Sequence, residues 1–123
     1  MLRMKDELQK AKSADAVLIT SDCLGTGNEE LGKILMKAFL NTLWDHEPKP
    51  GKILFINRGV MLTTEGSEVL ETLELLEKEG VEILSCGTCL VFYEIKDKLR
   101  IGKITTMPYT VDSLLSAAKV VTI

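Results

Sequence analysis

Short apolar runs alternate with longer amphipathic segments along most of the chain. The runs are rich in β-branched residues and are bounded by glycine, proline or charged residues, which is typical of short buried strands. They cover residues 16–19, 53–56, 81–84, 103–105 and 120–122. Segments with helical spacing of apolar residues lie between them, at 28–44, 67–80, 90–99 and 110–118. This alternation predicts an α/β fold: a three-layer α/β/α sandwich with a mainly parallel sheet of about five strands.

Polar residues and glycine predict where several of these helices begin and end. Asn28, Ser67 and Thr110 are placed to cap the first, second and last predicted helix. Gly80 is placed to end the second helix, because glycine readily adopts the left-handed conformation found after a helix C-terminus.

The first predicted helix has two apolar faces. One face consists of Leu31, Ile34, Leu35, Ala38 and Phe39, and we expect it to pack on the sheet. The other lies almost opposite and consists of Met36, Leu40, Leu43 and Trp44. A helix on a small domain needs only one apolar face, so the second face predicts a homo-oligomer, most simply with a two-fold axis. The alternative is that residues 1–13 fold back over this face.

Length and composition limit the classes of function. The 123 residues suit one domain, which we expect at 15–123 after an N-terminal extension or linker at 1–14. The net charge of −3 argues against nucleic acid as a partner. No apolar run approaches the ~20 residues of a membrane helix, so we expect no membrane contact. Three cysteines without a secretory signal favour the reducing cytoplasm.

The residues with the most chemical potential follow the predicted strands. Parallel α/β sheets bind ligands beyond the carboxyl ends of their strands, so we expect the site at this edge. All three cysteines of the chain, Cys23, Cys86 and Cys89, belong to this set. The other candidate binding residues are Ser21, Asp22, Asn57, Arg58, Thr88 and Thr105.

The Cys86–Cys89 pair is the strongest candidate for catalysis. If Thr88 caps the following helix, both thiols lie where free backbone N–H groups stabilise a thiolate, and a nearby Arg58 would add to this. The pair would then serve as a nucleophile or carry a persulfide. The alternative is that these are buried, inert thiols.

Metal and phosphate sites are weaker interpretations. Zinc would need Cys23 and His46 as further ligands, and His46 is more typical of a surface histidine, so we expect neither a metal nor a resident cofactor. The glycine loop at 24–28 could cradle a phosphate, but Glu29 and Glu30 would repel it. We interpret that loop as a turn capped by Asn28.

Three segments together resemble a known family. They are 17–27, with Gly25-Thr26-Gly27; 57–60, Asn57-Arg58-Gly59-Val60; and 80–90, which contains Cys86-Gly87-Thr88-Cys89-Leu90. Over roughly residues 15–123 the chain resembles the DsrE/DsrF-like family. Within it, the chain is most similar to the C-terminal domain of YedF-type sulfurtransferase-like selenium metabolism proteins.

The resemblance implies a five-stranded α/β/α fold and a role in sulfur or selenium trafficking. By position, Cys86 matches the cysteine that carries a persulfide in sulfur-relay members, and Cys89 would assist it. The implied partners are a sulfur donor or acceptor protein, such as a TusA-like domain, and further copies of the chain. Two alternatives stay open: a non-catalytic binding or assembly module of the same fold, and a thiol–disulfide oxidoreductase.

Overall fold

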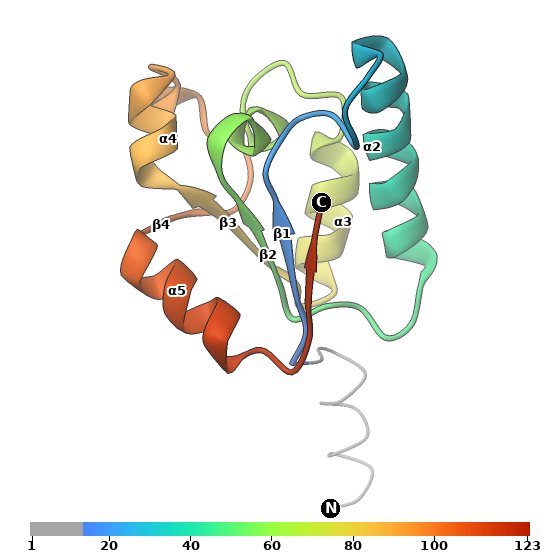
Figure 1. Ribbon diagram of the computed structural model, residues 1–123, viewed down its shortest axis with the longest axis vertical. Coiled ribbons are helices and arrows are strands. Elements are labelled where there is room, and N and C mark those ends of the chain that lie inside the picture. The colour runs from blue at the N-terminus through green and yellow to red at the C-terminus, as the bar shows by residue number, and fades with distance from the viewer. Residues whose placement is uncertain (1–13) are drawn as a thin grey trace, which may run out of the picture.

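The sheet of this protein has five strands, and every pair of neighbours is parallel. The computed structural model describes residues 14–123 (Figure 1), so the extension expected at 1–14 lies outside the described residues apart from Ala14. The strands are β1 (Ala16–Ile19), β2 (Lys52–Phe55), β3 (Glu82–Cys86), β4 (Lys103–Thr105) and β5 (Val120–Thr122). Their order in the sheet is β4-β3-β2-β1-β5, and the predicted α/β class is confirmed.

The order of the strands decides which loops can meet. Strand β2 lies between β1 and β3, with Ile53 in register with Val17 on one side and Ile83 on the other. The loops that follow these three strands therefore leave the same edge side by side. The short strands β4 and β5 form the outer edges, and Thr105 of β4 is in register with Cys86.

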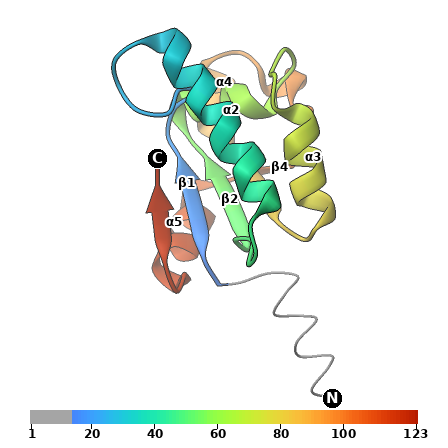
Figure 2. The same ribbon diagram turned by 90° about the vertical axis from the view of Figure 1, so that its right-hand side faces the viewer.

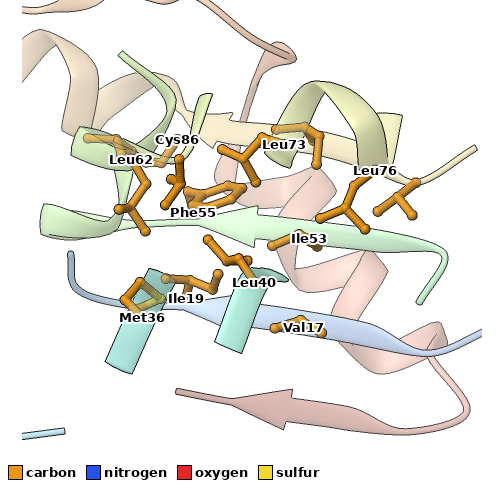
Figure 3. Packing of buried hydrophobic residues seen from close by; sticks show 14 of the residues in the cluster. Val17, Ile19, Met36, Leu40, Ile53, Phe55, Leu62, Leu73, Leu76 and Cys86 are labelled. Atoms are coloured by element: carbon orange, nitrogen blue, oxygen red, sulfur yellow. The ribbon is translucent and has the colours of Figure 1, made fainter. Parts of the chain in front are cut away.

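Helices cover both faces of the sheet, as Figures 1 and 2 show. Helices α2 (Glu29–Asp45) and α3 (Leu70–Lys78) lie on one face, and α5 (Met107–Ser116) lies on the other. The main core fills the space under α2 and α3, where Met36, Leu40 and Leu73 meet strand residues such as Phe55 (Figure 3).

Helix α2 packs with the face opposite to the expected one. Gly32, Met36 and Leu40 are buried, whereas Leu31, Ile34 and Leu35 are exposed. Both faces are apolar, so hydrophobic spacing could not choose between them. Gly32 identifies the inner face: a Cβ atom there would lie 2.7 Å from Cys23 Cβ, so only glycine lets the loop after β1 pack this closely against α2.

Among the predicted helix ends, the start of α2 and the end of α3 were right, and the start of the last helix was wrong. Asn28 caps α2 by accepting the Leu31 N–H at 2.8 Å. Gly80 has a φ of 97° just after α3, in agreement with a glycine stop. The last helix begins at Met107, not at 110, because Thr106 is its cap and Pro108 fits the first turn. Thr110 lies buried inside α5 instead.

The segments around the third strand also differ from expectation. The helix expected at 90–99 is α4 (Gly87–Phe92), followed after a turn by the 3-10 helix η2 (Lys96–Lys98). Glu94, with a φ of 59°, lies between them. A second 3-10 helix, η1 (Asn57–Thr63), follows β2 and was not predicted. Ser67 does not cap α3 directly: its hydroxyl accepts the Val69 N–H in the turn before the helix.

Within residues 14–123, none of the helices combines the length and the apolar character needed to cross a bilayer.

Candidate active site at the carboxyl edge of the sheet

The residues predicted for the site come together at the carboxyl edge of β1, β2 and β3. Asp22 and Cys23 follow β1, Asn57 and Arg58 begin η1 directly after β2, and Cys86 ends β3. Side-chain contacts join the three loops: Arg58 pairs with Asp22, and the Asn57 backbone contacts Cys89. The expected clustering is therefore confirmed for these residues.

Cys86 and Cys89 form a pair of neighbouring thiols at the start of α4, close enough for Cys86 to influence the Cys89 thiol. Cys86 is the N-cap residue of α4 and Cys89 is the third residue of that helix. Side chains at the N-cap and at the third helical residue both face the first turn of a helix, as in the capping box. Cys86 is only 4% exposed and belongs to the hydrophobic core (Figure 3), whereas Cys89 is partly exposed. The pair thus has one inner and one outer thiol.

The surroundings of Cys89 raise its pKa. Burial of the thiol is the largest cause, and the hydrogen bond with Cys86 adds to it. The backbone N–H of Asn57 donates to Cys89 Sγ at 3.1 Å and opposes this increase, because it stabilises the thiolate. The lowered pKa expected at a helix start is therefore wrong for Cys89. Helix α4 has only six residues, and its dipole is correspondingly small.

Tyr93 holds Asn57 in place and was missed in the sequence. Its hydroxyl donates to Asn57 Oδ1 at 2.6 Å, while Asn57 adopts a left-handed backbone with a φ of 51°. Asparagine tolerates this conformation better than most residues. The available signal was spacing: Tyr93 lies four residues after Cys89, one helical turn further along the same face.

Arg58 forms an ion pair with Asp22 and acts on Cys23, whereas we expected it to lie beside the Cys86–Cys89 pair. Its Nη2 and Nε lie 3.2 and 3.3 Å from the two carboxylate oxygens of Asp22. Burial raises the pKa of the Cys23 thiol, and the negative charges of Asp22 and Glu29 raise it further. Arg58 and Lys33 oppose that change. Cys23 is therefore held as a thiol.

The remaining predicted residues have smaller or different roles. Ser21 shapes the loop after β1, because its hydroxyl accepts the Cys23 N–H at 3.1 Å. Thr88 is exposed inside the first turn of α4 and does not cap it, since Cys86 holds that position. Thr105 is buried beside Cys86 at the end of β4.

The glycine loop is a turn, as interpreted. Gly25 and Gly27 have φ values of 83° and 135°, which only glycine adopts easily, and Asn28 then caps α2. His46 is exposed beyond the far end of α2, with its Nδ1 at 3.1 Å from the Pro48 carbonyl oxygen. In the part of the chain from 14 to 123, no three or more His, Cys, Asp or Glu side chains are grouped to hold a metal ion.

A cavity of about 280 Å³ adjoins the Asp22–Arg58 pair, between α2 and the segment after β2. Three basic residues line it, Lys33, Lys37 and Arg58, together with acidic residues and the apolar side chains of Met36 and Leu62. The cavity could hold a small polar ligand, but its residues are not those of the thiol pair.

Comparison with known proteins places the fold. No protein family model matches the chain, and no curated protein matches it. Among solved structures, the ychN protein from E. coli superposes with a TM-score of 0.69 and 19% sequence identity, covering 91% of this chain and 99% of that one. MTH1491, a protein of unknown function from Methanobacterium thermoautotrophicum, gives a TM-score of 0.65 at 17% identity, covering 89% and 97%. With its all-parallel five-stranded sheet and these neighbours, the chain has a DsrE-like α/β fold.

Proposed function

We propose that this protein is a persulfide-carrying, sulfurtransferase-like domain of sulfur or selenium trafficking, similar in role to YedF-type proteins. The observation that carries the proposal is the contact between an outer thiol, Cys89, and an inner thiol, Cys86, at the edge where parallel α/β sheets bind their ligands. The DsrE-like fold agrees with this role. A reducing cytoplasm would keep both thiols free.

The exposure of the two thiols suggests an order of events. The sequence resemblance implies Cys86 as the first sulfur acceptor, but Cys86 is packed in the core. Cys89 is the more accessible thiol, and its sulfur already accepts the Asn57 N–H. We therefore propose that Cys89 is the first thiol to react with the donor. Cys86 then reacts, from the core side, with the sulfur bound at Cys89.

The first step is a simple displacement. The Cys89 thiolate attacks the sulfane sulfur of a persulfide or thiosulfonate donor, the new S–S bond forms, and the donor leaves as a thiolate or sulfinate. The proton of Cys89 goes to solvent. An acceptor thiolate or selenium species can then attack the outer sulfur of the Cys89 persulfide. A small TusA-like carrier domain fits the role of donor or acceptor.

The experiment is mass spectrometry of the reduced protein after incubation with a thiosulfonate donor. We expect a gain of one sulfur atom in the first product, placed on Cys89 by peptide mapping. Because the pKa of Cys89 is raised, uptake should become faster as the pH rises from neutral towards that pKa. Cys23→Ser is the matched control and should take up sulfur like the wild type. Absence of any sulfur-dependent change in wild type would refute the proposal.

Thiol–disulfide exchange is the second candidate, because the same contact between Cys86 and Cys89 favours disulfide formation. A low-molecular-weight disulfide distinguishes the two functions. An oxidoreductase reduces it catalytically in the presence of a dithiol, whereas a sulfur carrier reacts faster with the sulfane-sulfur donor. Inertness towards both reagents would favour a binding module that uses the cavity beside Arg58.

A further inference from the structure

The inner thiol of the pair lies beside the residue that would carry the persulfide, because Cys86 and Cys89 are the N-cap and third residue of α4. Cys86 is packed in the core, whereas Cys89 is partly exposed. A sulfane sulfur delivered from solvent adds to the exposed side of Cys89 Sγ, which leaves Sγ itself as the sulfur nearer to Cys86. The product depends on which of the two sulfurs is attacked. Attack on the outer sulfur transfers it to the attacking thiol as a new persulfide, whereas attack on the inner sulfur releases the outer sulfur as sulfide.

We propose that Cys86 attacks Sγ of the Cys89 persulfide, so that sulfur leaves this protein as hydrogen sulfide and the pair becomes a disulfide. This inference rests on the proposed uptake of sulfur at Cys89. The Cys86–Cys89 bond forms as the bond from Sγ to the outer sulfur breaks. The outer sulfur leaves as HS⁻, and the proton that the Cys86 thiol gives up on attack converts it to hydrogen sulfide. The sulfane sulfur gains two electrons, and the two cysteine thiols supply them.

Three features of the site favour this route. Positions 86 and 89 are the N-cap and third residue of one helix start, where side chains approach closely enough for a disulfide. The Asn57 N–H already donates to Cys89 Sγ, so it can stabilise the negative charge that passes through this atom. The core around Cys86 also keeps external reagents from reacting with this thiol before Cys89 takes up sulfur.

The route gives the protein a second partner. Each turnover leaves a disulfide, so a dithiol reductant must reset the pair before it can accept sulfur again. The reductant reaches the disulfide through Cys89, the more exposed of the two. The protein would thus need two partners: a sulfane-sulfur donor, and a dithiol that reduces the disulfide.

The test uses the reduced full chain, freed of small thiols under anaerobic conditions, and benzenethiosulfonate as the donor. Its leaving group is benzenesulfinate, so any sulfide must come from the protein-bound sulfur. Sulfide is measured by trapping with a bimane reagent, and the protein is alkylated and mapped by mass spectrometry. For wild type we expect sulfide to appear in step with loss of the Cys86 and Cys89 alkylation sites to a disulfide.

Variants separate the steps. Cys86→Ser should retain a stable persulfide on Cys89 and release sulfide at least about tenfold more slowly, since no inner thiol remains. Cys89→Ser, which retains both Cys23 and Cys86, should take up no sulfur. Cys86→Ala replaces Cys86→Ser if the buried hydroxyl impairs folding, and circular dichroism checks both.

The outcomes distinguish this inference from the function on which it rests. A wild-type protein that gains sulfur and keeps it as a persulfide overturns sulfide release but supports sulfur carriage. A persulfide on Cys86 in Cys89→Ser overturns the order of the two thiols and with it the proposed attack. If neither wild type nor Cys86→Ser gains sulfur or releases sulfide, sulfur carriage itself is wrong.

Discussion

The pKa values of Cys89 and Cys23, at the carboxyl edge of the sheet, depend on a few neighbouring groups each. Cys89 is held between the inner thiol of Cys86 and the backbone N–H of Asn57, which act on its pKa in opposite directions. Cys23 is controlled by a separate group of charges around Asp22 and Arg58. Because the two thiols have different neighbours, substitutions can change one and leave the other as an internal reference.

Replacing Tyr93 by phenylalanine should make Cys89 less reactive. The substitution removes the hydroxyl that bonds Asn57 Oδ1 and loosens a residue in a left-handed conformation. The Asn57 N–H then donates less well to Cys89, so the pKa of Cys89 rises further. We expect alkylation of Cys89 by iodoacetamide to shift to higher pH and to slow several-fold at pH 8. An unchanged pH profile for Cys89, with Cys23 as reference, would show that Tyr93 has no such positioning role.

Replacing Asp22 by asparagine should make Cys23 more reactive. After burial, the charge of Asp22 is the main cause of the raised Cys23 pKa, and its removal also frees Arg58 to act on the thiol. The pKa of Cys23 should fall, and alkylation near pH 8 should become faster while that of Cys89 stays the same. The free energy of unfolding should change by less than about 1 kcal/mol, because Arg58 is half exposed and asparagine keeps a polar group at position 22. Slower labelling of Cys23 would contradict this account.

Secondary-structure elements bring these contacts together. Helix α2 is the clearest example, because its inner face supports the loop that carries Cys23. Gly32, Met36 and Leu40 follow each other at intervals of four residues along this face. On the outer face, Ile34 is 59% exposed. The two faces have similar composition, but the inner face contributes much more to the free energy of unfolding than the outer face.

Alanine substitutions on the two faces of α2 should therefore differ strongly. Leu40→Ala leaves a cavity against the sheet and should cost about 2–5 kcal/mol of unfolding free energy. Ile34→Ala removes an exposed side chain and should change it by less than about 0.5 kcal/mol. Urea denaturation of both variants measures the difference. A large loss for Ile34→Ala would indicate that another subunit covers the outer face.

On the scale of the whole molecule, the two faces of the sheet are covered unequally. Helices α2 and α3 cover one face, but α5 is the main cover of the other (Figures 1 and 2). Apolar side chains remain exposed on α4 and α5, with Phe92 at 78% and Leu115 at 83%. On α5, Met107, Val111 and Leu115 follow each other at intervals of four residues and share one side.

We propose that the protein self-associates through this side of α5, and not through Met36 and Leu40, which the core already uses. Sedimentation at micromolar concentration should show an assembly for wild type, and Leu115→Glu should dissociate it by placing a charge in the contact. Ile34→Glu, on the outer face of α2, is the matched control and should stay assembled. Wild type that sediments as a monomer contradicts self-association, and dissociation by Ile34→Glu alone would place the contact on α2.

The strands were the easiest part of the molecule to predict. The ranges expected at 16–19, 103–105 and 120–122 agree with β1, β4 and β5, because short apolar runs between turn residues have few other uses. The loop residues after the strands followed from the rule for parallel sheets. The segment after β2 was harder to predict. It forms the 3-10 helix η1, whose three-residue period is not visible in the spacing of its apolar residues.

By itself, the sequence determined the α/β class, the gathering of the candidate residues at the carboxyl edge and the closeness of Cys86 and Cys89, because each follows from local pattern, short spacing or the rule for parallel sheets. Only the tertiary structure decided which face of α2 is buried, since both faces satisfy the same helical period. It also decided that Cys86 lies in the core and Cys89 outside, and that Arg58 faces Asp22. These features depend on the strand order β4-β3-β2-β1-β5, which brings residues distant in the chain together and which no local pattern encodes.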